Sequence, residues 1–223
     1  MFTGIIEHEG KIESLELKPD GGRVTIHAPS VAPLLAVSKS IAVNGCCLTV
    51  VALDKKRFSA DLSRETIQKT SFGAKTAGLK RGSRVNLEQP ITAASELGGH
   101  FVLGHVDTTG RVTDLRCEGE NWWFGVEVSE DFARYIVPKG SITIDGISLT
   151  VARWNANTRV AEIAVIPYTY EHTNIRDRKP GDAVNLEGDV LGKYVERYLD
   201  ARKETRSETH ANLTIEKLVA QGF

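Results

Sequence analysis

The sequence predicts an all-β protein, built from two similar closed Greek-key β-barrels in tandem and followed by a C-terminal α-helix. Three observations lead to this fold class: the chain repeats itself, each copy has the pattern of short strands, and only the last segment has an apolar stripe at helical spacing. The 223 residues suffice for two small domains, since domains commonly run about 100–150 residues.

The repeat is a duplication of a whole domain. Residues 41–50 (IAVNGCCLTV) align with residues 142–151 (ITIDGISLTV), and residues 82–88 (GSRVNLE) align with residues 181–187 (GDAVNLE). A period of about 100 residues is a domain, because solenoid units span only about 20–50 residues. The expected segments are a first barrel, a second barrel and a helix with a tail, at residues 1–97, 98–189 and 190–223.

Turn signals and alternating polarity predict antiparallel strands in each copy. Asn44-Gly45 and Asp145-Gly146 predict type I′ hairpins, because that turn needs positive φ at both central residues. Closure into a barrel is favoured over an open sandwich, since it leaves no free sheet edge in so small a domain.

Helices are expected to be few. One short helix is expected in each copy, over residues 30–35 and 131–135, and another over residues 214–219, ending at Gly222. The last segment carries an amphipathic stripe. This stripe consists of Leu191, Tyr194, Val195, Tyr198 and Leu199. The stripe needs a surface to cover it, and the residues alone leave open whether that surface is the chain's own barrel or another subunit.

Composition argues against several classes of protein. Charged residues make up 26% of the chain and the net charge is -1, so no basic excess drives binding to nucleic acid or to an anionic membrane. No apolar stretch approaches the roughly 20 residues that span a bilayer, and the first residues lack the pattern of a secretory signal. We therefore expect a soluble, cytoplasmic protein.

The three cysteines predict neither a disulfide framework nor a metal site. Their number is odd, and the adjacent Cys46 and Cys47 can bridge only through a strained ring. No pair of histidines stands near them at the spacing of zinc ligands. We expect Cys46 and Cys117 to be buried and reduced, whereas Cys47 is a candidate for chemistry.

The two copies differ where chemistry can be carried. Cys47 of the first copy aligns with Ser148 of the second, and Leu-Thr follows each of them. Side chains two residues apart in a strand share a face, so Cys47 lies beside Thr49. The same holds for Ser148 and Thr150. The alternative is that these are merely small residues that face a core.

A second difference lies in the segment that joins the copies. His105 occupies the place that Ile5 has in the first copy. A polar residue in an apolar position of a repeat indicates a role that only one copy performs, although a solvated imidazole in a glycine-rich turn is the simpler alternative. Motifs of NTPases, zinc proteases and serine hydrolases are absent from the sequence.

Five segments, in order along the chain, together resemble the riboflavin synthases of the homotrimeric alpha-chain type, which carry two lumazine-binding repeats. They are MFTGI at residues 1–5, NGCCLTV at 44–50, GGHFVLGH at 98–105, DGISLTV at 145–151 and VNLEGD at 184–189. The resemblance covers both copies and does not extend to the tail from Lys203 onward.

The resemblance implies an enzyme that converts two molecules of 6,7-dimethyl-8-ribityllumazine into riboflavin and 5-amino-6-ribitylamino-2,4-pyrimidinedione. A four-carbon unit passes from one lumazine to the other. No metal or other cofactor is implied, because the 7-methyl protons of the lumazine are already acidic. Much of the rate then comes from holding two like molecules in contact. The resemblance also implies a homotrimer, and it leaves an association with lumazine synthase open.

The resemblance further implies two substrate pockets. The first pocket would be lined by Gly4, Ile5, Ile6, Ser40, Cys47, Leu48, Thr49, Asp61, Leu62, Ser63, Arg64, Glu65, Thr66, Gly104, His105 and Val106. The second pocket would be lined by Lys139, Ser148, Leu149, Thr150, Ile166, Pro167, Tyr168, Thr169, Tyr170 and Glu171. The residues implied in catalysis are Cys47, His105, Ser40, Asp189 and Phe2, with His105 as the group that transfers a proton or stabilises an anion.

Two other functions stay open at this point. A lumazine protein or a yellow fluorescent protein has the same duplicated barrel but binds a chromophore without catalysis. Such non-catalytic proteins have typically lost part of the catalytic pattern in one half, whereas here Cys47, His105 and Ser148 are all present. A flavin-binding reductase barrel would need an attached nucleotide-binding domain, for which the chain leaves no room.

Overall fold

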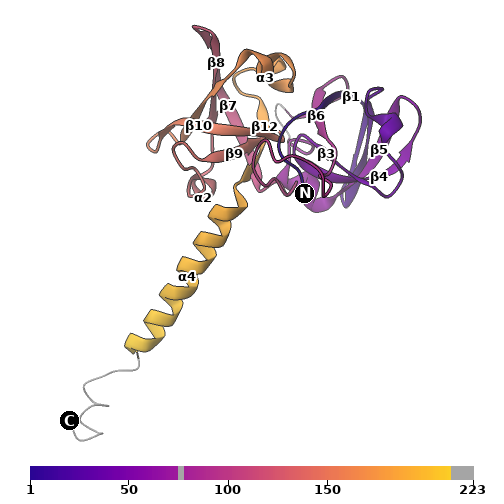
Figure 1. Ribbon diagram of the computed structural model, residues 1–223. Helices are drawn as coiled ribbons and strands as arrows, with labels where there is room; N and C mark the ends of the chain where they lie inside the picture. The colour runs from indigo at the N-terminus through magenta and orange to yellow at the C-terminus, as the bar shows by residue number, and fades with distance from the viewer. Residues whose placement is uncertain (75–77, 212–223) are drawn as a thin grey trace, which may run out of the picture. The chain divides into compact units, whose positions relative to one another are not determined.

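The computed structural model describes residues 1–74 and 78–211 (Figure 1). Residues 1–189 form one compact unit that contains two closed barrels, and the chain from Val190 onward forms a second unit. The predicted fold class, two closed barrels in tandem followed by a helix, is confirmed. The helix expected over residues 214–219 lies outside the described residues.

The first barrel contains six antiparallel strands in the order β1-β2-β5-β4-β3-β6, and β6 closes the ring on β1. The chain passes from β2 to β3 without pairing them, which is the Greek-key connection. The strands are β1 (His8–Lys18), β2 (Gly21–His27), β3 (Ser40–Val43), β4 (Cys46–Leu53), β5 (Arg57–Ser63) and β6 (Arg84–Glu88).

The second barrel repeats the first, strand for strand. Figure 1 shows its strands in magenta to orange, apart from the indigo and purple strands of the first barrel. The strands are β7 (Thr108–Glu118), β8 (Asn121–Glu127), β9 (Ser141–Ile144), β10 (Ile147–Asn155), β11 (Val160–Val165) and β12 (Ala183–Gly188). Each barrel has its own apolar core, rich in Val, Ile and Phe.

The two predicted hairpins are confirmed, and they touch each other. Asn44 and Gly45 have φ of 44° and 74°, and Asp145 and Gly146 have φ of 47° and 82°. A Cβ at Gly45 would lie 2.8 Å from the backbone nitrogen of Gly146. Because only glycine lets the two backbones approach so closely, the turns meet at the contact between the barrels.

Short helices occur where the sequence predicted them, and also elsewhere. The 3-10 helix η1 (Ala32–Leu34) lies within the expected segment, and α2 (Glu130–Ala133) overlaps its expected segment but begins one residue earlier. The expectation of one helix in each copy was too low. The additional short helices are α1 (Arg64–Lys69), α3 (Pro167–Glu171) and the 3-10 helix η2 (Asn174–Asp177).

A buried polar network joins the barrels near the two hairpins. The side-chain amide of Asn86 donates to the carbonyl oxygen of Asp145 at 2.9 Å, and that of Asn185 donates to the carbonyl oxygen of Asn44 at 2.8 Å. The backbone N–H of Asn174 donates to Oδ1 of Asn86 at 2.8 Å, and the side-chain amide of Asn86 donates to Oδ1 of Asn174 at 3.0 Å. Each barrel therefore satisfies buried polar groups of the other, which would be costly to leave unpaired.

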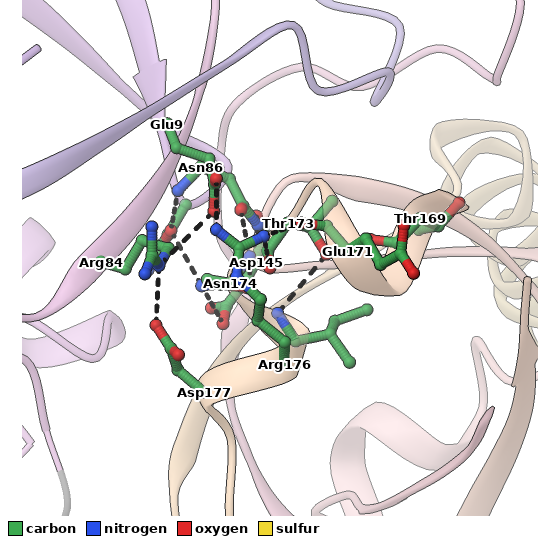
Figure 2. A network of polar contacts seen from close by, with 12 residues as sticks. Glu9, Arg84, Asn86, Asp145, Thr169, Glu171, Thr173, Asn174, Arg176 and Asp177 are labelled. Atoms are coloured by element: carbon green, nitrogen blue, oxygen red, sulfur yellow. Dashed lines mark hydrogen bonds and ion pairs between the residues drawn. The ribbon is translucent and has the colours of Figure 1, made fainter. Parts of the chain in front are cut away.

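Charged residues surround this network, as Figure 2 shows. Arg176 binds Glu9 at 2.6 Å, and Arg84 binds Asp177 at 2.8 Å, so both ion pairs connect one barrel with η2 of the other. Such partly exposed pairs contribute less than the amide network beneath them.

The helix α4 (Val190–Ala211) is the predicted C-terminal helix. The stripe residues named above are each more than half exposed, as Tyr194 at 72% illustrates. No helix among residues 1–74 and 78–211 has both the length and the apolar character needed to span a membrane.

Candidate functional site

The N-terminal segments of the two barrels are exchanged across the contact between them. Phe2 and Val102 form an antiparallel bridge, with N···O distances of 2.7 and 3.1 Å. Beyond this bridge, the backbone N–H of Cys47 donates to the carbonyl oxygen of Gly104, and that of Ser148 donates to Gly4, both at 2.8 Å. Each barrel is therefore covered by the first residues of the other.

A buried carboxylate holds each exchanged segment in place. Glu88 accepts hydrogen bonds from the backbone N–H groups of Thr3 and Gly4, at 2.6 and 3.0 Å. Glu187 accepts bonds from those of Gly104 and His105, at 3.1 and 3.0 Å. Burial raises the pKa of Glu88 above its usual value, and the bonds from Thr3 and Gly4 oppose that rise.

On the first barrel, the predicted polar side chains share one outward face. Ser40 of β3 lies opposite Thr49 of β4, and Ala42 lies opposite Cys47. Cys47 is half-buried and Thr49 is exposed, whereas their neighbours Cys46 and Leu48 point into the core. The period of two along β4 thus separates a core face from a face that can meet a ligand.

The second barrel presents the equivalent face with different side chains. Ser141 of β9 lies opposite Thr150 of β10, and Thr143 lies opposite Ser148. Ser148 is half-buried and Thr150 is exposed, as are their counterparts in the first barrel. A hydroxyl pair, Thr143 and Ser148, therefore replaces the pair of a methyl group and a thiol at Ala42 and Cys47.

The other predicted site residues lie at strand ends and in the short helices that follow. Residues 61–66 include the end of β5 and the start of α1, where the Ser63 hydroxyl accepts from the Thr66 N–H at 3.0 Å. Residues 166–171 occupy the same place after β11. The strands that these segments follow, β5 and β11, are the neighbours of β4 and β10 in their barrels. The candidate surfaces of the two barrels are therefore bordered in the same way.

Two further residues of the predicted site lie near the second barrel. Lys139 is exposed and has φ of 67°, in the turn before β9. Asp189 follows β12, and its charge acts on His100.

Several predicted site residues have other places in the structure. Gly4 lies against Ser148, and Ile6 packs on the core of the second barrel, so both contact the second barrel although they were expected to line the pocket of the first. Gly104 and Val106 contact the first barrel, the one whose pocket they are predicted to line. The exchange of segments accounts for this difference, since sequence motifs do not say which barrel a segment covers.

Four other predicted site residues are buried. Phe2 is fully buried between the barrels, where it packs with Val102, so its side chain does not reach the outward faces; its implied part in catalysis stays a prediction. Leu48, Leu62 and Leu149 belong to the barrel cores, so only their backbone could face the predicted pockets. Successive side chains of a strand point to opposite faces, so these leucines point away from the face of their polar neighbours.

The cysteines separate by exposure, and one expectation is corrected. Cys46 is buried, as predicted, but Cys117 is exposed near the tip of the β7–β8 hairpin, where the strands extend beyond the core. Burial raises the pKa of the Cys46 thiol to about 12. Since the thiolate is the reactive form, Cys46 should be inert in the folded chain.

Labelling with iodoacetamide tests this difference. We expect Cys117 to be alkylated first, and Cys46 to react only after unfolding, as mass spectrometry of peptides would show. Equal labelling of Cys46 and Cys117 in the native protein would contradict the placement of Cys46 in the core.

Sequence reasoning missed His100 and Thr143. The ring of His100 lies between two hydroxyls of the second barrel, 2.7 Å from Oγ of Ser148 and 3.0 Å from Oγ1 of Thr143. The histidine stands inside the GGHFVLGH segment, but it precedes the start of the aligned repeat and so has no counterpart. Thr143 could have been found as the polar replacement of Ala42.

The fold and these surfaces define a duplicated ligand-binding protein with two related half-sites. Comparison with known proteins agrees: the model of the lumazine binding domain matches residues 3–90 and 103–189. The riboflavin synthase of Actinobacillus pleuropneumoniae is 41% identical over 223 residues and is covered completely, as is this chain. That of Mycobacterium bovis is 46% identical over 202 residues, covering 89% of this chain and 98% of its own length.

The fold also matches a solved structure. A crystal structure of LumP complexed with riboflavin has a TM-score of 0.77 at 25% identity, covering 84% of this chain and 99% of that chain. The chain therefore belongs to the riboflavin synthase family, and it carries two lumazine binding domains.

Proposed function

We propose that this chain catalyses the dismutation of two molecules of 6,7-dimethyl-8-ribityllumazine, which gives riboflavin and 5-amino-6-ribitylamino-2,4-pyrimidinedione. The observation that supports it best is the pair of equivalent outward faces, each on β4 or β10 and each bordered by a segment of the other barrel. Two equivalent surfaces suit a reaction between two copies of one substrate, because holding both reactants replaces a random encounter.

The two faces would have different roles in the reaction, because their side chains differ. At the first face, the thiol of Cys47 lies beside the segment that carries His105, which Glu187 holds by its backbone. A thiol and an exposed imidazole can transfer protons near neutral pH. At the second face, Ser148 and Thr150 offer hydroxyls for hydrogen bonds to the other substrate molecule.

Turnover without an added cofactor tests the proposal. We expect the purified chain to convert 6,7-dimethyl-8-ribityllumazine into riboflavin, followed by absorbance, in the presence of a chelator and without nucleotide. Binding of the lumazine without any riboflavin formed would instead favour a chromophore-binding protein similar to LumP.

Two substitutions link that activity to the first face. Cys47→Ala and His105→Ala are each expected to lower kcat by roughly 100-fold, the range of general acid–base contributions, with an unchanged near-UV dichroism spectrum. Cys46→Ala is the matched control, because its side chain points into the core; it should lower stability more than turnover. Turnover at the wild-type rate in both site variants would exclude the assigned roles.

A further inference from the structure

The helix α3 borders the second face and exposes apolar side chains there. It follows β11, which is the neighbour of β10 in the barrel. Ile166 is 57% exposed and Tyr168 is 68% exposed. Ligand sites are lined mainly by apolar and aromatic side chains, so this helix supplies a kind of contact that the hydroxyls of Ser148 and Thr150 do not.

The start of α3 has no side-chain cap, unlike that of the equivalent helix in the first barrel. In α1 the hydroxyl of Ser63 accepts the N–H of Thr66 at 3.0 Å. In α3 the corresponding residue is Ile166, whose side chain has no acceptor. A missing cap weakens the start of a helix, and a helix of five residues is too short to be stable by itself. Other contacts must therefore hold α3 in place.

The two helices are anchored in the same way at their C-terminal ends. The hydroxyl of Thr173 donates to the carbonyl oxygen of Thr169 at 2.7 Å (Figure 2), and that of Thr70 donates to Thr66 at 2.6 Å. Neither bond acts on the residue that begins the helix. These anchors therefore do not replace the cap that α3 lacks.

An aromatic contact supports α3 from the sheet. The ring of Trp122, on β8, stacks on that of Tyr170, with the centroids 3.7 Å apart and the planes at 6°. Both side chains are half-buried and pack on the core of the second barrel. Trp122 lies opposite Val165, the last residue of β11, so it stands beside the point where the chain leaves the sheet for α3. Such a stack stabilises more than the burial of its area alone.

The first barrel has no equivalent of this stack. Gly22 lies opposite Leu62 on β5, which is the place that Trp122 has in the second barrel. The alignment of the two copies puts Ile67 at the position of Tyr170. The aromatic support therefore occurs only in the barrel whose helix lacks a cap.

We propose that Trp122 is a positioning residue for the second half-site: through its stack on Tyr170 it holds α3 ready for one lumazine. The helix then offers Ile166 and Tyr168 as an apolar border of the second face. This inference rests on the proposed function, in which that face binds a substrate molecule. Trp122 does not touch the substrate in this scheme, because Tyr170 covers its ring. A helix that is ordered beforehand raises affinity, since binding does not have to order it.

Trp122→Leu removes the stack and keeps an apolar side chain. We expect the KM for 6,7-dimethyl-8-ribityllumazine to rise by roughly 2- to 10-fold, the range that corresponds to aromatic pairs. The kcat should stay unchanged, because α3 would contact the substrate equally in the ground state and in the transition state. Trp122→Phe keeps a ring against Tyr170 and should recover most of the loss in affinity.

Trp123→Leu is the matched control. Trp123 follows Trp122 on β8, so its side chain points to the opposite face of the strand. There its ring centroid lies 4.1 Å from the guanidinium carbon of Arg153. We expect the wild-type KM in this variant. A rise in KM equal to that of Trp122→Leu would overturn the proposal, because it would show that any loss of an aromatic side chain from β8 weakens binding.

A double-mutant cycle tests whether the effect passes through the stack. If Trp122 acts only through Tyr170, then Trp122→Leu combined with Tyr170→Leu has the same KM as either single variant. Additive losses would overturn the proposal. Tyr170→Leu leaves β8 intact, so its KM decides whether the stack matters even where Trp122→Leu fails to fold, as thermal unfolding would show.

Amide hydrogen exchange at α3 gives a readout that is independent of turnover. The N–H groups of Tyr170 and His172 donate to the carbonyl oxygens of Ile166 and Tyr168, at 3.1 and 3.0 Å. We expect these amides to exchange faster in Trp122→Leu than in the wild type, and saturating riboflavin to restore their protection. Unchanged exchange in that variant would overturn the proposal.

The two readouts keep this inference apart from the proposed function. A wild-type chain that binds riboflavin but forms none from the lumazine would refute the proposed function. The riboflavin affinities of the same variants, together with amide exchange, would then decide whether Trp122 supports α3. Turnover in the wild type, with the wild-type KM in both Trp122→Leu and Tyr170→Leu, would refute the positioning role alone.

Discussion

Gly104→Ala is expected to destabilise the chain strongly and to abolish turnover. A Cβ at this position would lie 2.7 Å from Cβ of Cys47 and 2.9 Å from Cε2 of Phe2, both in the packed contact between the barrels. Gly104 also has φ of 81°, a region that L-residues adopt at a cost of about 1–2 kcal/mol. Overpacking adds about 1–3 kcal/mol, so we expect a total loss of roughly 2–5 kcal/mol.

The loss of turnover has a local cause. Gly104 carries the carbonyl that binds the N–H of Cys47, and it precedes His105. A side chain there forces the segment away from β4, which moves both groups that we assign to the first face. Urea unfolding and the riboflavin assay, performed on the same sample, measure the two effects together.

Gly181→Ala is the matched control for this experiment. Gly181 has φ of 96°, so it bears similar backbone strain, but a Cβ there would meet no heavy atom within 4 Å. We expect a loss near the strain cost alone, about 1–2 kcal/mol, and normal turnover. If Gly181→Ala were as damaging as Gly104→Ala, backbone strain rather than the contact with Cys47 would explain the result.

Much of the fold was predictable because its signals are local. The positive φ required by Asn44-Gly45 and Asp145-Gly146 is encoded in the turn residues themselves, and the duplication transferred each such inference to the other copy. The short helices were harder to predict. The helix α1 has only six residues and depends on a single cap at Ser63, which is too short for a periodic apolar pattern.

The arrangement of the half-sites was only partly predictable from the sequence. Strand alternation correctly placed Cys47 and Thr49 on one face and Cys46 on the other. The exchange of the segments that begin the barrels could not be inferred, because a pairing such as Phe2 with Val102 joins residues far apart in sequence, and no local pattern specifies it. His100 was missed for the same reason, since its importance arises only from contacts with strands of the second barrel.

The separation of the half-sites within one chain bears on how they act together. Two chain segments lie between Cys47 of β4 and Ser148 of β10. The segment that ends at Gly104 is bonded to β4, the segment that ends at Gly4 is bonded to β10, and the two segments are bridged to each other. Two intervening segments make three spacings between neighbouring backbones, at about 4.8 Å each, so the two faces are separated by roughly 14 Å. Two stacked ring systems need contact near about 3.5–4.0 Å. We therefore expect each active site to combine the first barrel of one chain with the second barrel of another, in the homotrimer that the family resemblance implies.

Complementation between two damaged chains should restore activity. Cys47→Ala damages the first face and Thr150→Ala the second, and each variant alone is expected to have little turnover. Mixed trimers obtained by refolding the two together would contain some sites with an intact first barrel and an intact second barrel, so riboflavin formation should return. Refolding each variant by itself is the control for recovery by refolding alone. If sites were confined to one chain, every site would carry a lesion, and mixed trimers verified by native mass spectrometry would stay inactive.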